Sequence, residues 1–266
     1  RVVFTIGNLS IYWYGLLIGC GLFLALLFAF RYAVDFGIDA DRLVDVILIG
    51  TICAVICARL YYVAFSPIAY NSLWDMINIR NGGIAIYGAV IGAAVFGGLA
   101  CKWRKIPILP TFDLVAMGFL IGQSIGRWGN FVNQEAFGSN TTLPWGMKSA
   151  ATQNYLAAWQ QTLANQGVTV DPNMPVHPTF LYESLWNLLV FFVLLYILKR
   201  KSLPNGIVTM TYLILYSVGR FFIESLRTDS LMFGPFRMAQ VVSIAAIIFA
   251  SAFIYFKLKK SKSIEK

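Results

Sequence analysis

The sequence predicts an all-α integral membrane protein with seven transmembrane helices. Of its 266 residues, 58% are hydrophobic and 12% are charged, whereas a soluble domain is about a quarter charged. Apolar runs long enough to cross a bilayer recur along the whole chain. The formal net charge of +9 does not indicate nucleic-acid binding, because the basic residues form short blocks between apolar runs and not an exposed basic domain.

The seven predicted spans are 10–30, 43–64, 83–101, 111–132, 178–198, 206–224 and 237–256. The first run lacks a small-residue cleavage site and is followed by further spans, so we expect a transmembrane helix and not a signal peptide. The connecting segments that are rich in lysine and arginine all fall on one side: 31–42, 102–105, 199–201 and 257–266. The positive-inside rule therefore predicts an N-terminus outside and a C-terminus in the cytoplasm.

The only long connection, 136–177, joins the fourth and fifth spans on the outer side. We expect it to form a small extracytoplasmic cap within a single polytopic domain over 1–266. Tyr155, Leu156, Trp159 and Leu163 recur at helical spacing in this segment. Their pattern suits either an amphipathic helix on the membrane surface or a cap that packs on itself.

Cysteine and histidine spacing predicts neither a metal site nor a bound cofactor. Cys53 and Cys57 share a helical face, but no second pair of ligands accompanies them. We interpret the four cysteines as small apolar side chains.

The polar residues inside the spans gather at the outer side. The run 126–135 places Arg127, Asn130 and Glu135 at the end of an apolar helix, where an arginine is costly unless it is paired. On the sixth span Tyr212, Tyr216, Arg220 and Glu224 are spaced by four and form one stripe. This stripe fits either an ion pair within the bundle or a site for an anionic headgroup, because arginine presents paired donors to phosphate.

Further candidates come from glycines and from the only histidine. Gly82 and Gly83 precede the third span, where backbone N–H groups at a helix start can bind an anion. Gly118, Gly122 and Gly126 form a small-residue face that suits close helix packing. His177 comes directly before Pro178, and its position suits a capping residue more than a base.

The run from Gly126 to Glu135 resembles the signature Gly-Arg-x-Gly-Asn-Phe-x-Asn-x-Glu of the prolipoprotein diacylglyceryl transferases. Other segments resemble the same family in the same order: Tyr12-Trp13-Tyr14-Gly15, Ala58-Arg59-Leu60, Gly82-Gly83-Ile84, His177-Pro178-Thr179, Leu181-Tyr182-Glu183, and Gly219-Arg220-Phe221 with Glu224 and Arg227. The resemblance covers essentially the whole chain.

The resemblance implies an enzyme of the bacterial cytoplasmic membrane whose site opens to the outer leaflet. Its substrates would be phosphatidylglycerol and the lipobox cysteine of a preprolipoprotein signal peptide, and it would transfer the diacylglyceryl group to the thiol and release glycerol phosphate. By matching motifs, the expected catalytic residues are Arg127, Arg220, Tyr216 and Glu135. The expected phosphatidylglycerol-binding residues are Arg127, Asn130, Arg220, Tyr14, Asn81, Gly82, Gly83, Glu224, Arg227 and His177.

The sequence departs from the family at Asn81, where many members have a histidine that has been proposed as the base. Asparagine cannot accept a proton at neutral pH, so another group must do so or no strong base is needed. We expect Arg127 and Arg220 to form a cationic clamp on the leaving phosphate. Glu135 or Glu224 would hold an arginine in place or, if desolvated, accept the thiol proton. A transporter or flippase for anionic lipids is the alternative hypothesis.

Overall fold

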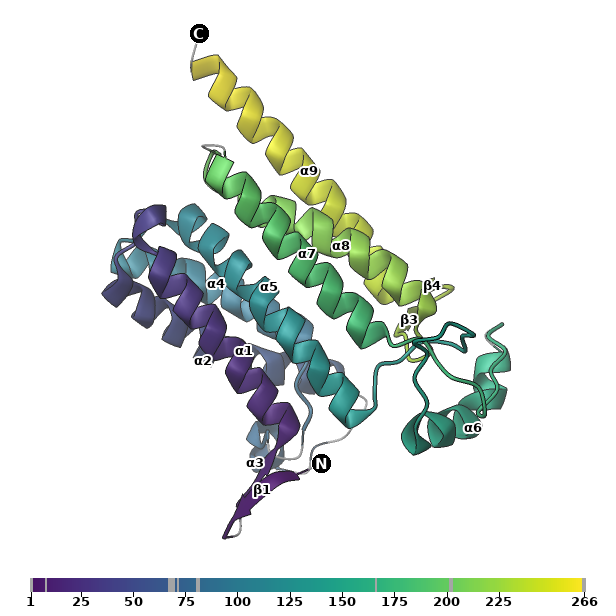
Figure 1. Cartoon of the computed structure of the whole chain (residues 1–266). Coiled ribbons are helices and arrows are strands. Elements are labelled where there is room, and N and C mark those ends of the chain that lie inside the picture. The colour runs from purple at the N-terminus through teal and green to yellow at the C-terminus, as the bar shows by residue number, and fades with distance from the viewer. Residues whose placement is uncertain are drawn as a thin grey trace. The chain divides into compact units, whose positions relative to one another are not determined.

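The computed structural model describes residues 2–7, 9–66, 70, 72–79, 82–165, 167–200 and 203–264. Its helices and strands follow one another along the chain as shown in Figure 1. In order they are β1 (Val2–Ile6), β2 (Leu9–Tyr12), α1 (Trp13–Tyr32), the 3₁₀ turn η1 (Val34–Phe36), α2 (Ala40–Phe65), α3 (Leu73–Ile77), α4 (Ile86–Arg104), α5 (Ile108–Asn133), α6 (Ala150–Asn165), α7 (Thr179–Arg200), α8 (Ile207–Leu226), β3 (Met232–Phe233), β4 (Phe236–Arg237) and α9 (Met238–Ile264).

Within the described residues, seven helices are long and apolar enough to span a membrane, namely α1, α2, α4, α5, α7, α8 and α9. This confirms the predicted all-α membrane fold and its seven spans. The predicted third span began at residue 83, but α4 begins at Ile86 because Gly82 and Gly83 adopt positive φ values of 80° and 78° in the preceding turn. The orientation of the termini and the single domain over 1–266 stay predictions.

The chain forms two compact units, residues 1–29 with 115–266, and residues 30–114. In the first unit α7, α8 and α9 pack side by side as antiparallel neighbours (Figure 1). The packing of α7 and α8 on α5 buries a cluster of apolar side chains: Met117, Leu120, Val190, Leu194 and Val208. Van der Waals contacts between such side chains help to hold membrane helices together.

The small-residue face of α5 packs against α1, as its spacing suggested. A Cβ atom on Gly21 would lie 3.3 Å from the carbonyl oxygen of Gly122, and one on Gly118 would lie 3.5 Å from that of Ala25. The two backbones therefore approach closely because neither side carries a side chain there.

In the second unit α2 packs along α4 through a similar face. A Cβ on Gly88 would lie 2.4 Å from the carbonyl oxygen of Cys57, and one on Gly92 would lie 2.6 Å from the Cβ of Cys57. Cys57 thus fills a narrow space between helices, in agreement with its interpretation as a small apolar residue.

Arg59 organises the turn before α4 in the same unit. This arginine is only 8% exposed, and its guanidinium donates to four carbonyl oxygens, those of Asp75 (2.6 Å), Met76 (2.7 Å), Gly82 (2.9 Å) and Gly83 (2.7 Å). Backbone carbonyls therefore satisfy its donors without a carboxylate partner. Gly83 cannot carry a side chain, because its Cβ would lie 2.5 Å from Nη1 of Arg59.

The connection 136–177 contains α6 and has an apolar cluster of its own. Leu156 and Leu163 of α6 are buried against Phe137, Val170 and Val176. Of the two alternatives left open by the sequence, the structure supports a segment that packs on itself, since its apolar side chains face one another.

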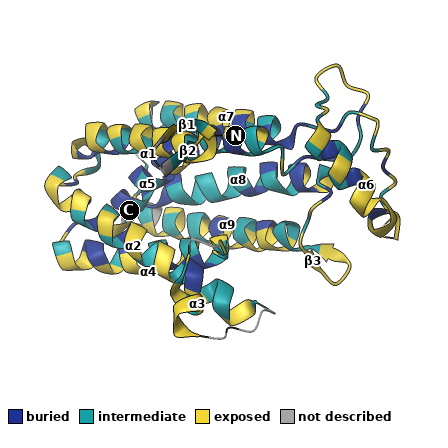
Figure 2. Ribbon diagram, turned by 90° about the horizontal axis from the view of Figure 1, so that it is seen from below, coloured by how far each residue is buried: buried dark blue, intermediate teal, exposed yellow. Residues whose placement is uncertain are grey.

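Two short hairpins were not predicted from the sequence. β1 pairs with β2 ahead of α1, and β3 pairs with β4 between α8 and α9. The β3–β4 hairpin is largely exposed (Figure 2), and Phe233 is 61% accessible. In strands this short, apolar and polar residues alternate over too few positions to predict a strand from the sequence.

Candidate active site

Glu183 lies in the first turns of α7 and is the centre of a buried cluster of charges. Its carboxylate, in a residue only 4% exposed, contacts guanidinium groups from two other helices and from the end of α8. The start of α7 is fixed because the hydroxyl of Thr179 donates to the carbonyl oxygen of Ala136. We call Arg127, Glu183, Arg220, Glu224 and Arg227 the arginine–glutamate cluster.

Arg127 reaches the cluster from the last turns of α5. Its Nη2 lies 2.7 Å from Oε2 of Glu183. Two buried hydroxyls hold α5 against α7 at this level, because Oγ of Ser184 donates to the carbonyl oxygen of Ser124 at 2.8 Å. The indole of Trp128 also donates to Oγ of Ser184 at 3.2 Å, so the helix end that carries Arg127 is held firmly.

Arg220 joins the two carboxylates of the cluster. Its Nη1 lies 2.5 Å from Oε1 of Glu183, and its Nη2 lies 2.5 Å from Oε2 of Glu224, one turn along α8. Gly219 makes this possible, because a Cβ there would lie 2.2 Å from the indole nitrogen of Trp186. Glu224 is 2% exposed, so the pair is removed from water and each charge depends on its partner.

Arg227 follows the last residue of α8 and is held mainly by Asp229. Its Nε and Nη2 donate to the two carboxylate oxygens of Asp229 at 3.0 and 2.8 Å, and its Nη1 lies 3.6 Å from Glu183. Because three of its nitrogens face carboxylates, Arg227 has few donors left for a ligand. Its geometry suits a positioning role better than the substrate contact expected from the motif.

The arginine–glutamate cluster has three arginines and two buried carboxylates, those of Glu183 and Glu224. Asp229 pairs with Arg227 and balances the third positive charge. Arg127 makes a single ion pair among the described residues and keeps its other nitrogens available. The cluster can therefore accept an anion in a region of low dielectric, where a charge–charge contact is stronger than in water.

The polar residues of the signature run beyond Arg127 bind one another. Asn130 and Asn133 each donate a side-chain amide hydrogen to Oε1 of Glu135 at 3.1 Å. Glu135 is exposed and forms no ion pair with an arginine among the described residues, so Glu183 and Glu224 take the role that was considered for it. Its own role stays a prediction.

Tyr14 and Tyr216, both predicted as site residues, lie in the same compact unit as the cluster. The ring of Tyr14 lies so close to Gly129 that a Cβ on this glycine would be 2.5 Å from the ring. Tyr216 lies one turn before Arg220 on α8 and lines a crevice with it. The centroid of its ring is 5.8 Å from that of Tyr212.

His177 lies in the segment just before α7 and hydrogen-bonds to Tyr182. Its Nδ1 is 3.2 Å from the Tyr182 hydroxyl, which accepts from the indole of Trp145 at 2.9 Å. Burial lowers the pKa of His177 below its ordinary value, so the imidazole is neutral at pH 7. It forms no ion pair with the cluster, and its backbone N–H donates to the carbonyl oxygen of Ser139 at 3.0 Å.

The remaining predicted residues belong to the second unit or lie outside the described chain. Asn81 lies outside the described residues. The carbonyl oxygens of Gly82 and Gly83 accept from Nη1 of Arg59, and the N–H of Gly82 donates to the carbonyl oxygen of Ile79 at 3.1 Å. These two glycines do not open a helix, because α4 begins at Ile86, so the geometry of an anion site at a helix start is not present at them.

Among the described residues, no group of three or more histidine, cysteine, aspartate or glutamate side chains could hold a metal ion.

The sequence profile of the prolipoprotein diacylglyceryl transferases matches residues 1–256. The chain belongs to this family. It is 42% identical over 264 residues to the phosphatidylglycerol–prolipoprotein diacylglyceryl transferase of Clostridioides difficile strain 630, which covers 99% of this chain and 97% of that protein. It is also 42% identical to the protein of the same name from Bacillus cytotoxicus, over 99% of this chain and 94% of the relative. This chain is thus similar to both relatives along nearly its whole length, so the family membership applies to both compact units.

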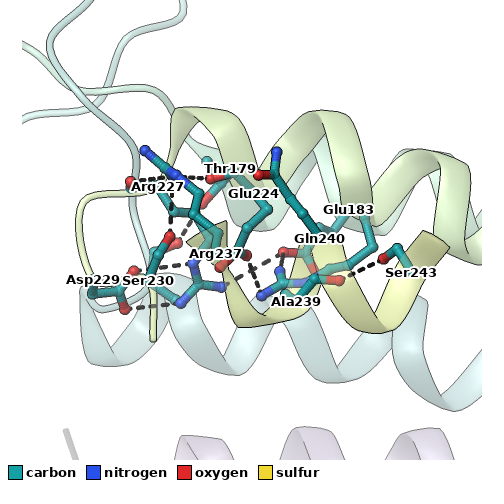
Figure 3. Close-up of polar contacts among 12 residues, drawn as sticks. Thr179, Glu183, Glu224, Arg227, Asp229, Ser230, Arg237, Ala239, Gln240 and Ser243 are labelled. Carbon is teal, nitrogen blue, oxygen red and sulfur yellow. Dashed lines mark hydrogen bonds and ion pairs between the residues drawn. The ribbon is translucent and has the colours of Figure 1, made fainter. Parts of the chain in front are cut away.

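In this family member, Arg237 and Gln240 support the end of α8, and no sequence pattern singled them out. Figure 3 shows Arg237 beside Arg227 and Ser230 at the end of α8. Nη1 of Arg237 donates to the carbonyl oxygens of Glu224 and Arg227, the latter at 2.8 Å, and to Oγ of Ser230 at 3.0 Å. Nε2 of Gln240 donates to the carbonyl oxygen of Phe221 at 3.1 Å. Together they satisfy the carbonyls that a helix leaves unpaired at its end, and Arg237 complements the helix dipole.

Replacing Arg237 by methionine is expected to destabilise the transferase by about 2–3 kcal/mol, since a charged donor to several carbonyls is lost. Arg237→Lys should retain most of the stability, because an ammonium group also donates to several oxygens. Thermal unfolding in detergent measures both. Arg42→Met is the matched control, since Arg42 is exposed and lies 3.7 Å from Asp39, and such pairs contribute little. Equal losses for Arg237→Met and Arg42→Met would contradict the role of Arg237.

Gly138 joins the start of α7 to the end of α8. Its N–H donates to the carbonyl oxygen of His177 at 2.9 Å, and the next N–H, of Ser139, donates to that of Leu226 at 2.7 Å. A Cβ on Gly138 would lie 2.8 Å from the Cβ of His177 and 2.9 Å from the Leu226 carbonyl oxygen. The segment thus fixes the distance between the two helix ends that carry Glu183 and Arg227.

Gly138→Ala is expected to push these helix ends apart, at a cost of about 1–3 kcal/mol in stability and with a clear loss of catalytic turnover. Gly97→Ala is the control, because a Cβ on Gly97 meets nothing within 4 Å and alanine favours the helix. Unfolding temperature and turnover of both variants are compared. If Gly138→Ala behaved like Gly97→Ala, the segment would not set the geometry of the cluster.

Proposed function

We propose that this chain transfers the diacylglyceryl group of phosphatidylglycerol to the lipobox cysteine thiol of a preprolipoprotein, and releases glycerol phosphate. The observation that carries the proposal is the convergence of Arg127 and Arg220, from two different helices, on one buried carboxylate at 2.7 and 2.5 Å. Two guanidinium groups held in this way fit a phosphodiester, whose oxygens accept paired hydrogen bonds.

In the proposed reaction the substrate thiol attacks the glyceryl carbon that bears the phosphate. A carbon–sulfur bond forms, the carbon–oxygen bond breaks with its electron pair on the phosphate, and the thiol proton passes to water. Glycerol phosphate therefore leaves with one more negative charge than the phosphodiester carried. Arg127 and Arg220 stabilise the charge that develops on the leaving phosphate. The attacking sulfur belongs to the substrate, which agrees with the packing role of Cys57 between α2 and α4.

The other residues of the first unit have supporting roles in this proposal. Glu183 and Glu224 hold the guanidinium groups in place before the lipid enters. Tyr216, beside Arg220, orients the headgroup, and Asn130 and Glu135 order the end of α5.

We also propose that the site faces the outer leaflet of the bacterial cytoplasmic membrane. The cluster lies at the start of α7 and the end of α8, whereas Lys199 and Arg200 end α7, and Lys257, Lys259 and Lys260 lie in the last part of α9. The positive-inside rule supports a cytoplasmic location for these lysine-rich ends. The cluster then lies on the opposite side.

The test is a turnover assay with the purified full chain in detergent or nanodiscs. Phosphatidylglycerol and a lipobox peptide are added, and mass spectrometry follows the peptide while released glycerol phosphate is measured. A gain of one diacylglyceryl group, absent with a Cys→Ser peptide, supports the proposal. Binding or movement of the lipid between leaflets, without any gain in peptide mass, would support a lipid transporter or flippase and overturn it.

A further inference from the structure

Asn187 lies on the same face of α7 as Glu183, one helical turn further along the helix. It is 1% exposed, and its Nδ2 has no hydrogen-bond partner among the described residues. The side chain lines a crevice with Glu183, Trp186, Tyr216, Arg220 and Ile223. This crevice is too narrow to hold a water molecule, so water does not satisfy the amide.

An unpaired amide in such a place costs stability, because buried donors are almost always hydrogen-bonded. The surroundings contain better-satisfied polar groups at the same end of α7, where Ser124 and Ser184 pair with each other. The amide of Asn187 is thus a buried donor that this region leaves unpaired. A donor left free beside the arginine–glutamate cluster is suited to a ligand that enters with its own acceptor.

The position of Asn187 along α7 indicates which part of a lipid it would meet. Glu183 and Arg220 mark the level of the phosphate under the proposed function, and Asn187 lies about 6 Å further into the span. In a phosphatidyl lipid the two acyl esters occupy the other two glyceryl carbons, one next to the carbon that carries the phosphate and one a carbon further on. In a bilayer they lie on the inner side of the phosphate, towards the acyl chains.

We propose that Asn187 is a substrate-binding residue whose Nδ2 donates to an ester carbonyl oxygen of the diacylglyceryl group. The inference rests on the proposed function and extends it, because it assigns a group that distinguishes acyl esters from other linkages. Tyr216 and Trp186 line the same crevice and have to shift to admit the ester. The carbonyl then gives the amide the partner that it lacks in the empty protein.

The test compares diester phosphatidylglycerol with a dialkyl ether analogue, which has no carbonyl oxygen. Wild-type protein should transfer the diacylglyceryl group of the ester lipid about tenfold faster than the dialkylglyceryl group of the ether, the effect of one lost hydrogen bond to a buried donor. Asn187→Leu should transfer from the ester lipid about tenfold more slowly than the wild type and from the ether lipid at the wild-type rate. The ratio of the ester rate to the ether rate then falls to near one. Without added lipid, Asn187→Leu should unfold at the same temperature as the wild type or at a higher one, because an unpaired amide is replaced by an apolar group.

Gln123→Leu is the matched control, since Gln123 is an amide in the same unit whose Oε1 accepts from the Tyr212 hydroxyl at 3.2 Å. It should lose stability but keep the wild-type ratio between the two lipids. Competition between the two lipids for binding in nanodiscs is measured by native mass spectrometry in parallel. A wild-type protein without ester preference in binding and turnover, or an Asn187→Leu variant that keeps it, overturns the inference. Ester-selective binding that depends on Asn187 but without any transfer overturns the proposed function alone.

Discussion

Arg220→Ala is expected to slow diacylglyceryl transfer by about 10²–10³-fold, the loss seen when one preorganised donor to a developing oxyanion is removed. Among the residues that the structure describes, Arg220 is the only one whose guanidinium contacts both buried carboxylates, at 2.5 Å each. Its loss removes half of the proposed phosphate clamp. The measurement is the rate of diacylglyceryl transfer to a lipobox peptide, at saturating phosphatidylglycerol. Turnover near that of the wild type would refute the clamp.

The same substitution leaves Glu224 buried without its partner, so misfolding has to be separated from lost catalysis. Removing one partner of a buried ion pair typically costs about 3–5 kcal/mol. The double variant Arg220→Ala with Glu224→Gln removes the unpaired charge and should recover much of this stability. We expect its transfer rate to stay as low as that of Arg220→Ala. Recovery of activity together with stability would mean that Arg220 acts only in folding.

Glu183→Ala is expected to have the second largest effect, on stability as well as on transfer. It leaves Arg127 without its ion pair and takes one partner from Arg220 and Arg227. The repulsion between uncompensated arginines should destabilise the protein by about 3–5 kcal/mol. Unfolding in detergent, followed by tryptophan fluorescence, measures the loss.

Phosphatidylglycerol offers a direct check on this explanation. If the Glu183 carboxylate pairs with the arginines in place of a phosphate when no lipid is bound, the lipid should stabilise Glu183→Ala more than it stabilises the wild type, by linkage. Zwitterionic phosphatidylcholine is the control lipid. Equal stabilisation by both lipids would argue that Glu183 is a packing residue and does not compete with a phosphate.

The sequence predicted the seven spans and the gathering of charges, because both depend on local composition. Apolar runs of helical length predict α-helices in a membrane regardless of how they pack. Arg127 and Arg220 stood out because an arginine inside an apolar helix needs a partner. Their guanidinium groups indeed contact the same carboxylate.

The choice among carboxylates could not be predicted in the same way. Glu183 follows Pro178 in the first turns of α7, where an acidic residue is common for reasons of helix dipole alone. Glu135 lies closer to Arg127 in the sequence, yet it accepts from Asn130 and Asn133. Only the packing of α5 against α7 decides between the two. The support from Arg237 likewise depends on a hairpin whose two-residue strands carry no recognisable pattern.

The distribution of the ion pairs over the helices has a consequence for biogenesis. Arg220 and Glu224 lie in one helix and neutralise each other, so α8 can enter the bilayer from the translocon as a neutral unit. Arg127 of α5 and Glu183 of α7 neutralise each other only after the two helices meet, and until then each charge carries an insertion cost of about 2.5–3.5 kcal/mol. We therefore expect α5 to remain near the translocon until α7 has been synthesised, so that the pair to which we assign a role in the reaction also times the assembly of the protein.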